Sequence, residues 1–277
     1  MEFKSFYKTV EGGEGNRCKY PTRLDMYGCG CQHNCPYCYA RSLLSFRGMW
    51  DAEHPRTADR EGVKKILDKI EKGTILRLGG MTDAFQPIEK ELGHSKWLVE
   101  ELNKRDIGYL IVTKSDYLAD YLGDVMRKDL AHIQVSVTSS LNDTFLEKSA
   151  PPQTKRMECA EKLYDMGFDV ALRVSPYIPG FVDSDWILKS KVEKITVEFL
   201  RVNALIKKQL PFIDTTPFTY KAGGYYHLPI ETKMAVLKPY IGKKVLSVCE
   251  DVPSHYRYFI KNVNANPDDC CNLRKVL

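Results

Sequence analysis

The chain has 277 residues, of which 43% are hydrophobic and 28% are charged, and it carries a formal net charge of +5 at pH 7. This composition predicts a sizeable core within one large barrel-type domain or two smaller ones. The chain contains no run of about 18 apolar residues, so no membrane span is expected, and its charged first ten residues do not predict a secretory signal.

The nine cysteines, without an export signal, indicate a reducing compartment, the cytoplasm, in which thiols serve metal binding or catalysis. The mild basicity permits a polyanionic partner but does not require one. Thiols are therefore the residue type whose spacing is most informative in this chain.

Hydrophobic runs alternate with longer helical patterns through most of the chain. Residues 1–22 are polar and form a predicted lead-in segment. Strands are predicted at Leu24–Cys29, Thr74–Leu78, Gly108–Thr113, Ile133–Thr138, Val170–Val174 and Lys194–Leu200. Helices are predicted at Tyr39–Phe46, Arg60–Lys72, Ile88–Arg105, Tyr117–Met126 and Lys155–Met166. Six strand-then-helix units over residues 24–208 predict an α/β fold of parallel strands with helical crossovers.

Residues 209–277 form a predicted C-terminal extension that caps the barrel. An irregular aromatic stretch over residues 210–228 comes first and contains a Gly-Gly pair. A helix is predicted at Pro229–Tyr240 and a last strand at Lys244–Cys249. The aromatic stretch is suited either to stacking on a base or to packing over the open side of the barrel.

The loop after the first predicted strand carries three closely spaced cysteines. Cys31, Cys35 and Cys38 are spaced C-x3-C-x2-C. Thiolates suit iron–sulfur clusters and zinc, and three of them can hold three irons of a cubane while leaving the fourth iron open to a reactant. Zinc sites usually combine two cysteine or histidine pairs, and the next cysteine, Cys159, is too distant to complete a local pair. Cys29 is interpreted as a small residue at a strand end.

This run, G-C-x-H-x-C-x-Y-C-Y-A-R, resembles the radical S-adenosylmethionine (SAM) superfamily, and within it the subgroup around spore photoproduct lyase. The resemblance implies a partial (β/α)6 barrel over residues 23–208 and a [4Fe–4S] cluster ligated by Cys31, Cys35 and Cys38. It also implies SAM bound at the open iron, with its reductive cleavage to a 5′-deoxyadenosyl radical. An external electron donor such as a flavodoxin or ferredoxin is then expected. Tyr37 fills the aromatic position before the last cysteine.

The residues that follow each predicted strand are the remaining site candidates, because reactive groups of such barrels gather at the carboxyl ends of the strands. The resemblance places a Gly-rich stretch after the second strand against the methionyl end of SAM, and glycine permits close backbone approach. The residues that fill this stretch are Gly79, Gly80, Met81 and Thr82, followed by Asp83 as a catalytic candidate. Further residues expected around SAM are Lys114, Ser136, Arg173 and Ser175. Arg173 must meet an anion, either the SAM carboxylate or a structural acid such as Glu198.

One departure from the subgroup concerns the end of the reaction. Spore photoproduct lyases carry a hydrogen-donor cysteine just before a Thr-Ser-Asp stretch, and here the matching residues Gly80 to Asp83 include no cysteine. Cys249, which follows the last predicted strand, is therefore a candidate hydrogen donor, with Tyr39 as a candidate radical relay. Cys249 is alternatively a packing residue beneath the tail. For Cys270 and Cys271 the hypotheses are a hydrogen donor, a redox pair, a second cluster or small buried side chains.

The resemblance favours a thymine or modified thymine base in DNA as the substrate. Basic residues suited to phosphate contacts are Lys189, Lys191, Lys194, Lys207 and Lys208, and the alternative for them is an ordinary solvated face. A second hypothesis is a radical SAM enzyme that modifies a peptide or protein. A third is a non-enzymatic zinc-binding module.

Overall fold

The computed structural model describes residues 6–140 and 146–273. Its main sheet has eight strands in the order β1-β2-β5-β6-β7-β8-β9-β12. The strands from β2 to β12 are parallel to their neighbours, and β1 is antiparallel to β2. Within the described residues the sheet does not close, since β1 and β12 form its two edges. This arrangement confirms the α/β class and the partial barrel of parallel strands.

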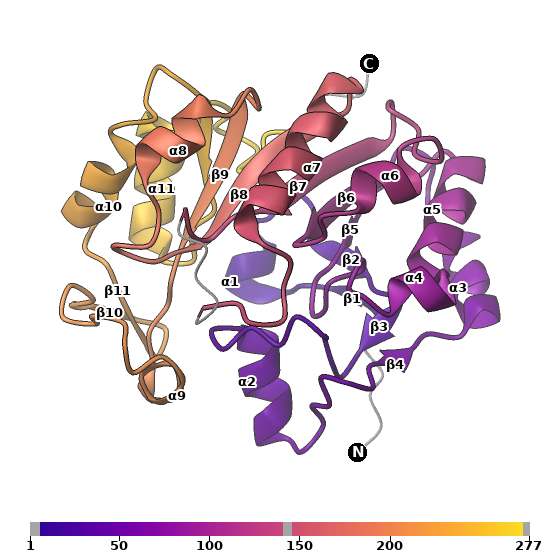
Figure 1. The fold of residues 1–277 in the computed structure, drawn as a ribbon, viewed down its shortest axis with the longest axis horizontal. Coiled ribbons are helices and arrows are strands. Elements are labelled where there is room, and N and C mark those ends of the chain that lie inside the picture. The colour runs from indigo at the N-terminus through magenta and orange to yellow at the C-terminus, as the bar shows by residue number, and fades with distance from the viewer. Residues whose placement is uncertain (1–5, 141–145, 274–277) are drawn as a thin grey trace.

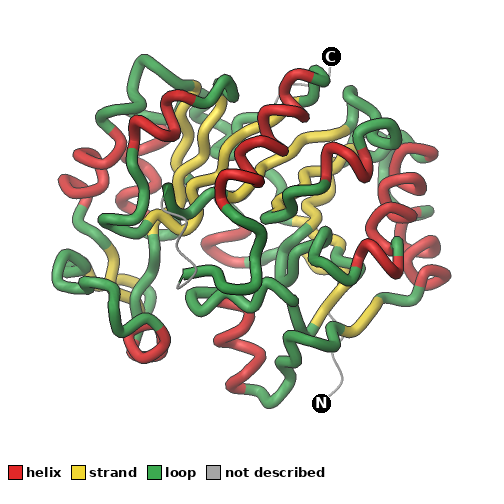
Figure 2. Tube along the Cα trace, viewed as in Figure 1, coloured by secondary structure: helices red, strands yellow, loops and turns green. Residues whose placement is uncertain are grey.

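The strands of the sheet are β1 (Tyr7–Thr9), β2 (Thr22–Leu24), β5 (Ile75–Leu78), β6 (Gly108–Thr113), β7 (Ala131–Ser136), β8 (Asp169–Tyr177), β9 (Lys194–Phe199) and β12 (Val245–Val248). Two small hairpins pair β3 (Tyr27–Gly28) with β4 (Arg56–Thr57), and β10 (Tyr220–Ala222) with β11 (Tyr225–His227). Figure 2 shows the strands gathered in the middle of the molecule with helices around them.

The helices are α1 (Gly12–Gly15), α2 (Tyr39–Phe46), α3 (Arg60–Leu67), α4 (Glu89–Leu92), α5 (His94–Lys104), α6 (Leu118–Leu122), α7 (Gln153–Asp165), α8 (Ser184–Lys189), α9 (Ala204–Gln209), α10 (Ile230–Leu237) and α11 (Pro253–Asn262). In Figure 1 they follow the sheet from α3, α4 and α5 at the right, through α6 and α7, to α8, α10 and α11 at the left. No helix within residues 6–140 and 146–273 is long and apolar enough to cross a membrane.

Alternation along the strands separates an apolar outer face from a polar inner face. In β7, Ile133 and Val135 join the main hydrophobic core, whereas Gln134 and Ser136 face the inside of the curved sheet. On the neighbouring β8, Arg173 points the same way and donates to Gln134 Oε1 at 2.7 Å. The helices therefore cover the apolar face, and the interior of the partial barrel is left to polar side chains.

The first predicted strand, Leu24–Cys29, is divided in the structure. The sheet strand β2 ends at Leu24, and Tyr27–Gly28 pairs with β4 in a separate hairpin. The chain leaves the sheet at Asp25, whose buried carboxylate accepts backbone N–H groups from the loop after β5. These three hydrogen bonds fix Asp25 at the point where the predicted strand is interrupted.

Both ends of the chain add to the sheet. Tyr7–Thr9, in the predicted lead-in, pairs with β2, and Val245–Val248, in the predicted C-terminal extension, pairs in parallel with β9. The last strand is thus confirmed close to its predicted position of Lys244–Cys249. The tail beyond α11 packs Cys271 and Leu273 against Leu110 on β6.

Candidate functional site

The three-cysteine loop is folded tightly at the carboxyl end of the sheet. The backbone N–H of Asn34 donates to Cys31 O at 2.9 Å, and that of Cys38 donates to Cys35 O at 3.1 Å. Gly30 is required by packing, because a Cβ there would lie 1.7 Å from the carbonyl oxygen of Asp51. All three thiols line one cavity of about 210 Å³.

The donor set fits an iron–sulfur cluster. Burial raises the pKa of Cys31, and it raises that of Cys35 to about 12, so a thiolate here needs a metal cation in place of its proton. No three His, Cys, Asp or Glu side chains of the described residues converge as the ligands of a single ion would. A cubane binds each thiolate to a different iron, so its ligands need not converge on one point.

The Gly-rich loop after β5 is held from behind by Asp25. Asp25 Oδ1 accepts the backbone N–H groups of Gly79 and Gly80, each at 2.9 Å, and Oδ2 accepts that of Met81 at 3.2 Å. Gly79 has φ +91°, and a Cβ there would lie 2.4 Å from a backbone oxygen of β6. A Cβ on Gly80 would meet the side chain of Arg23 at 2.2 Å. Packing inside the protein therefore requires glycine at position 79, whereas a side chain at position 80 would require Arg23 to move.

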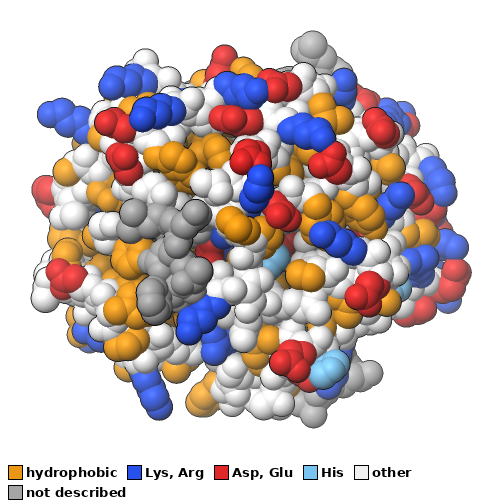
Figure 3. Space-filling model, in the orientation of Figure 1, with side chains coloured by type: hydrophobic (Ala, Val, Ile, Leu, Met, Phe, Trp, Pro, Cys, Tyr) orange, Lys and Arg blue, Asp and Glu red, His pale blue; other side chains and the backbone are white. Residues whose placement is uncertain are grey.

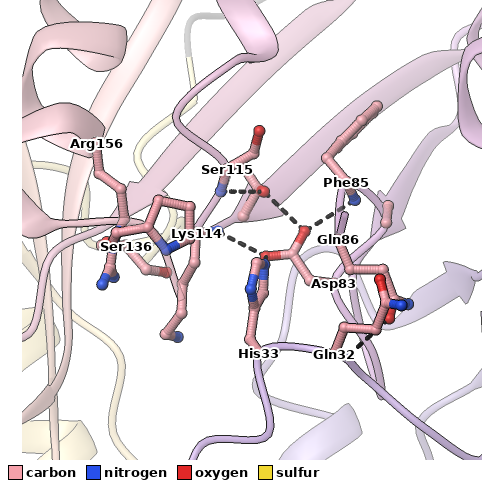
Figure 4. Close-up of polar contacts among 12 residues, drawn as sticks. Gln32, His33, Asp83, Phe85, Gln86, Lys114, Ser115, Ser136 and Arg156 are labelled. Carbon is pink, nitrogen blue, oxygen red and sulfur yellow. Dashed lines mark hydrogen bonds and ion pairs between the residues drawn. The ribbon is translucent and has the colours of Figure 1, made fainter. Parts of the chain in front are cut away.

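Asp83 joins the cysteine loop to the end of β6 (Figure 4). Its Oδ1 accepts from Phe85 N at 2.9 Å and from Thr113 Oγ1 at 2.7 Å, and its Oδ2 accepts from Lys114 N at 2.6 Å and lies 3.2 Å from His33 Nε2. Burial alone would raise the pKa of Asp83. The neighbouring His33, together with the donors named above, instead holds it at about 2. Protein groups surround both oxygens of this carboxylate, which is the geometry of a positioning residue.

Lys114 extends from the end of β6 over the same cavity. Its ammonium lies 5.6 Å from the ring centroid of Tyr37 and 3.9 Å from Glu147 Oε1. The other carboxylate oxygen of Glu147, Oε2, pairs with Arg156. The guanidinium of Arg156 also donates to the carbonyl of Ser136 at 3.0 Å. Within the described residues, the buried hydroxyl of Tyr37 has no hydrogen-bond partner. The cavity therefore keeps polar atoms that a bound ligand is able to satisfy.

Arg173 meets a structural acid, which was one of the two alternatives for it. Its guanidinium pairs with Glu198 Oε2, and the same oxygen accepts from Ser175 Oγ at 2.8 Å. Burial raises the pKa of Glu198, but the charges of Arg173 and Arg201, together with the hydrogen bonds from Ser175 and Arg173, bring that pKa to about 2. Arg77 on β5 also faces this interior, and its buried Nε has no partner among the described residues.

The structure brings together fourteen of the fifteen predicted site residues. Those that line the cavity are Cys31, Cys35, Tyr37, Cys38, Tyr39, Gly79, Gly80, Met81, Thr82, Asp83, Lys114, Ser136, Arg173 and Ser175. Tyr39 is 47% exposed, and its hydroxyl donates to the carbonyl of Gly80. Cys249 lines a second cavity instead.

Three acidic or histidine residues that position the side chains of the site were not identified from the sequence as site residues. Asp25 holds the Gly-rich loop, His33 pairs with Asp83, and Glu147 lies near Lys114. His33 is part of the G-C-x-H-x-C run, so the motif itself carried its signal. Asp25 and Glu147 carried none, because their partners lie far away in the sequence.

Residues 26–188, more than half of the chain, match the family described as the Radical SAM superfamily. The chain belongs to the radical SAM superfamily, whose members are enzymes that use an iron–sulfur cluster and SAM. The residues that line the cavity fit both groups, through three thiols and a set of unsatisfied polar atoms.

Similar proteins agree with the fold. The chain is 29% identical over 168 residues to "Uncharacterized protein MJ0683" of Methanocaldococcus jannaschii, covering 57% of this chain and 61% of that protein. Its fold is similar to spore photoproduct lyase complexed with dinucleoside spore photoproduct, with a TM-score of 0.65, 18% identity, and coverage of 88% of this chain and 79% of the other. A variant of that lyase with bound AdoMet and the same dinucleoside gives a TM-score of 0.64 at 16% identity, with coverage of 88% and 79%.

Proposed function

We propose that this enzyme cleaves SAM reductively at a [4Fe–4S] cluster held by Cys31, Cys35 and Cys38, and that the resulting adenosyl radical abstracts hydrogen from a thymine or modified thymine base in DNA. The observation that carries the proposal is that the three thiols and the Gly79–Thr82 loop line one cavity. Reduction needs one electron for each cleavage, from an external donor such as a flavodoxin or ferredoxin.

The chain's own residues have separate tasks in this proposal. Lys114, whose ammonium lies beside Tyr37, binds the carboxylate of SAM. Ser136 and Ser175 offer hydroxyls to the ribose. Asp83 takes no proton, because its low pKa keeps it ionised, and it holds the cysteine loop against β6.

A nucleic-acid substrate is supported by the rim of the cavity. Helix α9 follows β9 at the carboxyl end of the sheet, contributes Ile206 to the cavity and exposes Lys207 and Lys208. Lys207 lies 5.5 Å from the ring centroid of Tyr226, which is 40% exposed on β11. Ammonium groups beside an accessible aromatic ring suit a backbone phosphate and a base that stacks nearby.

The predicted basic run between residues 189 and 194 lies elsewhere. Lys194 begins β9, so it is at the end of the sheet opposite the cysteine loop, and Lys191 and Lys194 each pair with a carboxylate. The face drawn in Figure 3 intersperses basic and acidic side chains. Phosphate contacts are therefore assigned to α9 and its surroundings. The likeness to a lyase solved with a dinucleoside photoproduct supports a thymine-type substrate.

The test is anaerobic turnover with SAM, a reductant and an oligonucleotide whose thymine bases carry deuterium at the methyl group and at C6. Wild type is expected to form 5′-deoxyadenosine that contains deuterium, and Cys35→Ala is expected to form none. Cys159→Ala is the matched control, because Cys159 is buried on α7 rather than in the cavity. Undiminished product from Cys35→Ala refutes the cluster assignment. Product without deuterium refutes the thymine assignment and directs the search to a peptide substrate.

A further inference from the structure

Four cysteines from three distant parts of the chain converge in a second cavity. Cys18 follows α1, Cys249 directly follows β12, and Cys270 and Cys271 lie in the tail beyond α11. All four line one cavity of about 240 Å³. The neighbouring thiols of Cys249 and Cys271, together with burial, raise the pKa of Cys270, and burial and the same two neighbours raise the pKa of Cys18. All are free thiols.

The tail that carries two of these cysteines is held firmly in place. Asp269 accepts the backbone N–H of Cys271 at 2.8 Å and that of Leu273 at 3.1 Å, together with the hydroxyl of Tyr20 at 2.7 Å. Tyr20 is two residues beyond Cys18, so one carboxylate ties the two segments together. The hydrogen bond between Tyr20 and Asp269 joins segments about 250 residues apart, so the fold itself brings these cysteines together.

The segment that carries Cys18 is tied to the other side of the cavity as well. Arg17 donates to the carbonyl of Asp251 at 2.9 Å, and Tyr256 on α11 donates to the carbonyl of Arg17 at 3.2 Å. Asp251 is two residues beyond Cys249. Each cysteine-bearing segment is therefore anchored by a hydrogen bond within two residues of its thiol.

The cavity also supplies positive charge. Arg77 and Arg173 line it together with the four thiols, and the acidic residues of its lining are each paired with a cation: Glu198 with Arg173, Asp251 with Arg201 and Glu250 with Lys233. Arg173 is balanced by Glu198, whereas the buried Nε of Arg77 has no partner among the described residues. The buried guanidinium of Arg77 beside four thiols favours an anionic guest, because an unpaired charge is costly to bury.

We propose that Cys18, Cys249, Cys270 and Cys271 ligate a second iron–sulfur cluster. Four thiolates are the complete ligand set of a [4Fe–4S] cluster, so no iron is left open to a reactant. A single zinc ion would need its ligands to converge, and within residues 6–140 and 146–273 no such group exists. This site lies beyond the proposed function, and it makes Cys249 a cluster ligand in place of a hydrogen donor.

The test uses the full chain with Cys31, Cys35 and Cys38 all replaced by Ala, reconstituted anaerobically with iron and sulfide. Wild type is expected to hold about eight irons, and the triple variant about four. Adding Cys249→Ser and Cys270→Ser to the triple variant is expected to remove the remaining iron. Adding Cys159→Ser instead, as a matched control, is expected to leave it. Circular dichroism checks that each variant is folded.

A second measurement does not depend on how well the serine variants fold. In the reconstituted triple variant, the four thiols are expected to resist alkylation until iron is chelated, as read by mass spectrometry. The inference is overturned if the triple variant holds no iron and sulfide, if it holds one zinc, or if Cys249 and Cys270 form a disulfide under anaerobic conditions. Four irons in both wild type and triple variant would instead count against the first cluster, so the two proposals fail separately.

Discussion

Replacing Asp83 by Asn tests whether this carboxylate is the clamp between the cysteine loop and β6. The native contacts lower the pKa of Asp83 from 3.8 to about 2, although it is only 9% exposed. Nearly two pKa units at about 1.4 kcal/mol each amount to about 2 kcal/mol of stabilisation. The amide keeps the shape but loses the charge, so Asp83→Asn is expected to lower the free energy of unfolding by about 2 kcal/mol at pH 7.

The stabilisation that Asp83 provides should decrease as the pH falls. The folded-state pKa of Asp83 lies below the unfolded value, so its stabilisation is fully present above about pH 5 and is lost as the pH falls from about 4 to about 2. The difference between wild type and Asp83→Asn should therefore be constant from pH 7 to 5 and fall to about half at pH 3. Urea unfolding followed by circular dichroism at each pH measures it.

Asp214→Asn is the matched control, because Asp214 is exposed and bonds only within its own turn. It should change the unfolding free energy far less at neutral pH. An Asp83→Asn protein as stable as wild type at pH 7 contradicts the clamp. A stability difference between wild type and Asp83→Asn that stays constant down to pH 3 would also contradict it, because such a difference would not arise from the ionised carboxylate.

Three further predictions follow from other parts of the molecule. Gly79→Ala should destabilise the protein by more than Gly242→Ala, because Gly242 has a similar positive φ but open space around it. Thermal unfolding of both variants measures the difference, which is expected to be at least about 1 kcal/mol. Lys208→Ala should weaken oligonucleotide binding and lower the slope of log affinity against log salt by about 1, as measured by fluorescence anisotropy. Lys233→Met should cost about 3–5 kcal/mol in urea unfolding, because it leaves buried Glu250, now 2.6 Å from the ammonium, without its cation.

The helices and strands predicted most accurately from the sequence are those whose pattern of apolar residues lies within one continuous segment. The prediction of Gly108–Thr113 coincides with β6, and that of Tyr39–Phe46 with α2. A run of apolar residues or a helical period is contained within the segment itself, so no distant partner is needed to recognise it. Leu24–Cys29 was predicted wrongly as one strand because the interruption at Asp25 depends on the loop after β5, more than 50 residues later.

The site residues likewise divide into those that a local pattern predicts and those that depend on distant contacts. The cysteine loop carries its own spacing, and its neighbours in the cavity follow from the rule that strand ends meet in a barrel. The two clamps, by Asp25 and Asp83, depend on contacts between segments that no sequence pattern links. The approach of Cys18 to the tail is a contact across almost the whole chain. Its signal was only the unusual number of thiols.

The wall between the two cavities explains why both favour anionic guests. Tyr39, Gly80, Arg77 and Arg173 line the first cavity and also the second. Glu198 neutralises Arg173 from the side of β9, but the guanidinium of Arg77 has no recorded ion pair in the described part of the chain, and an unpaired buried charge is costly. A thiolate-bound cluster on either side of the wall would offset that cost. Because clusters on both sides would be attracted to the same cation, occupancy of one cavity should weaken the electrostatic attraction that the other offers.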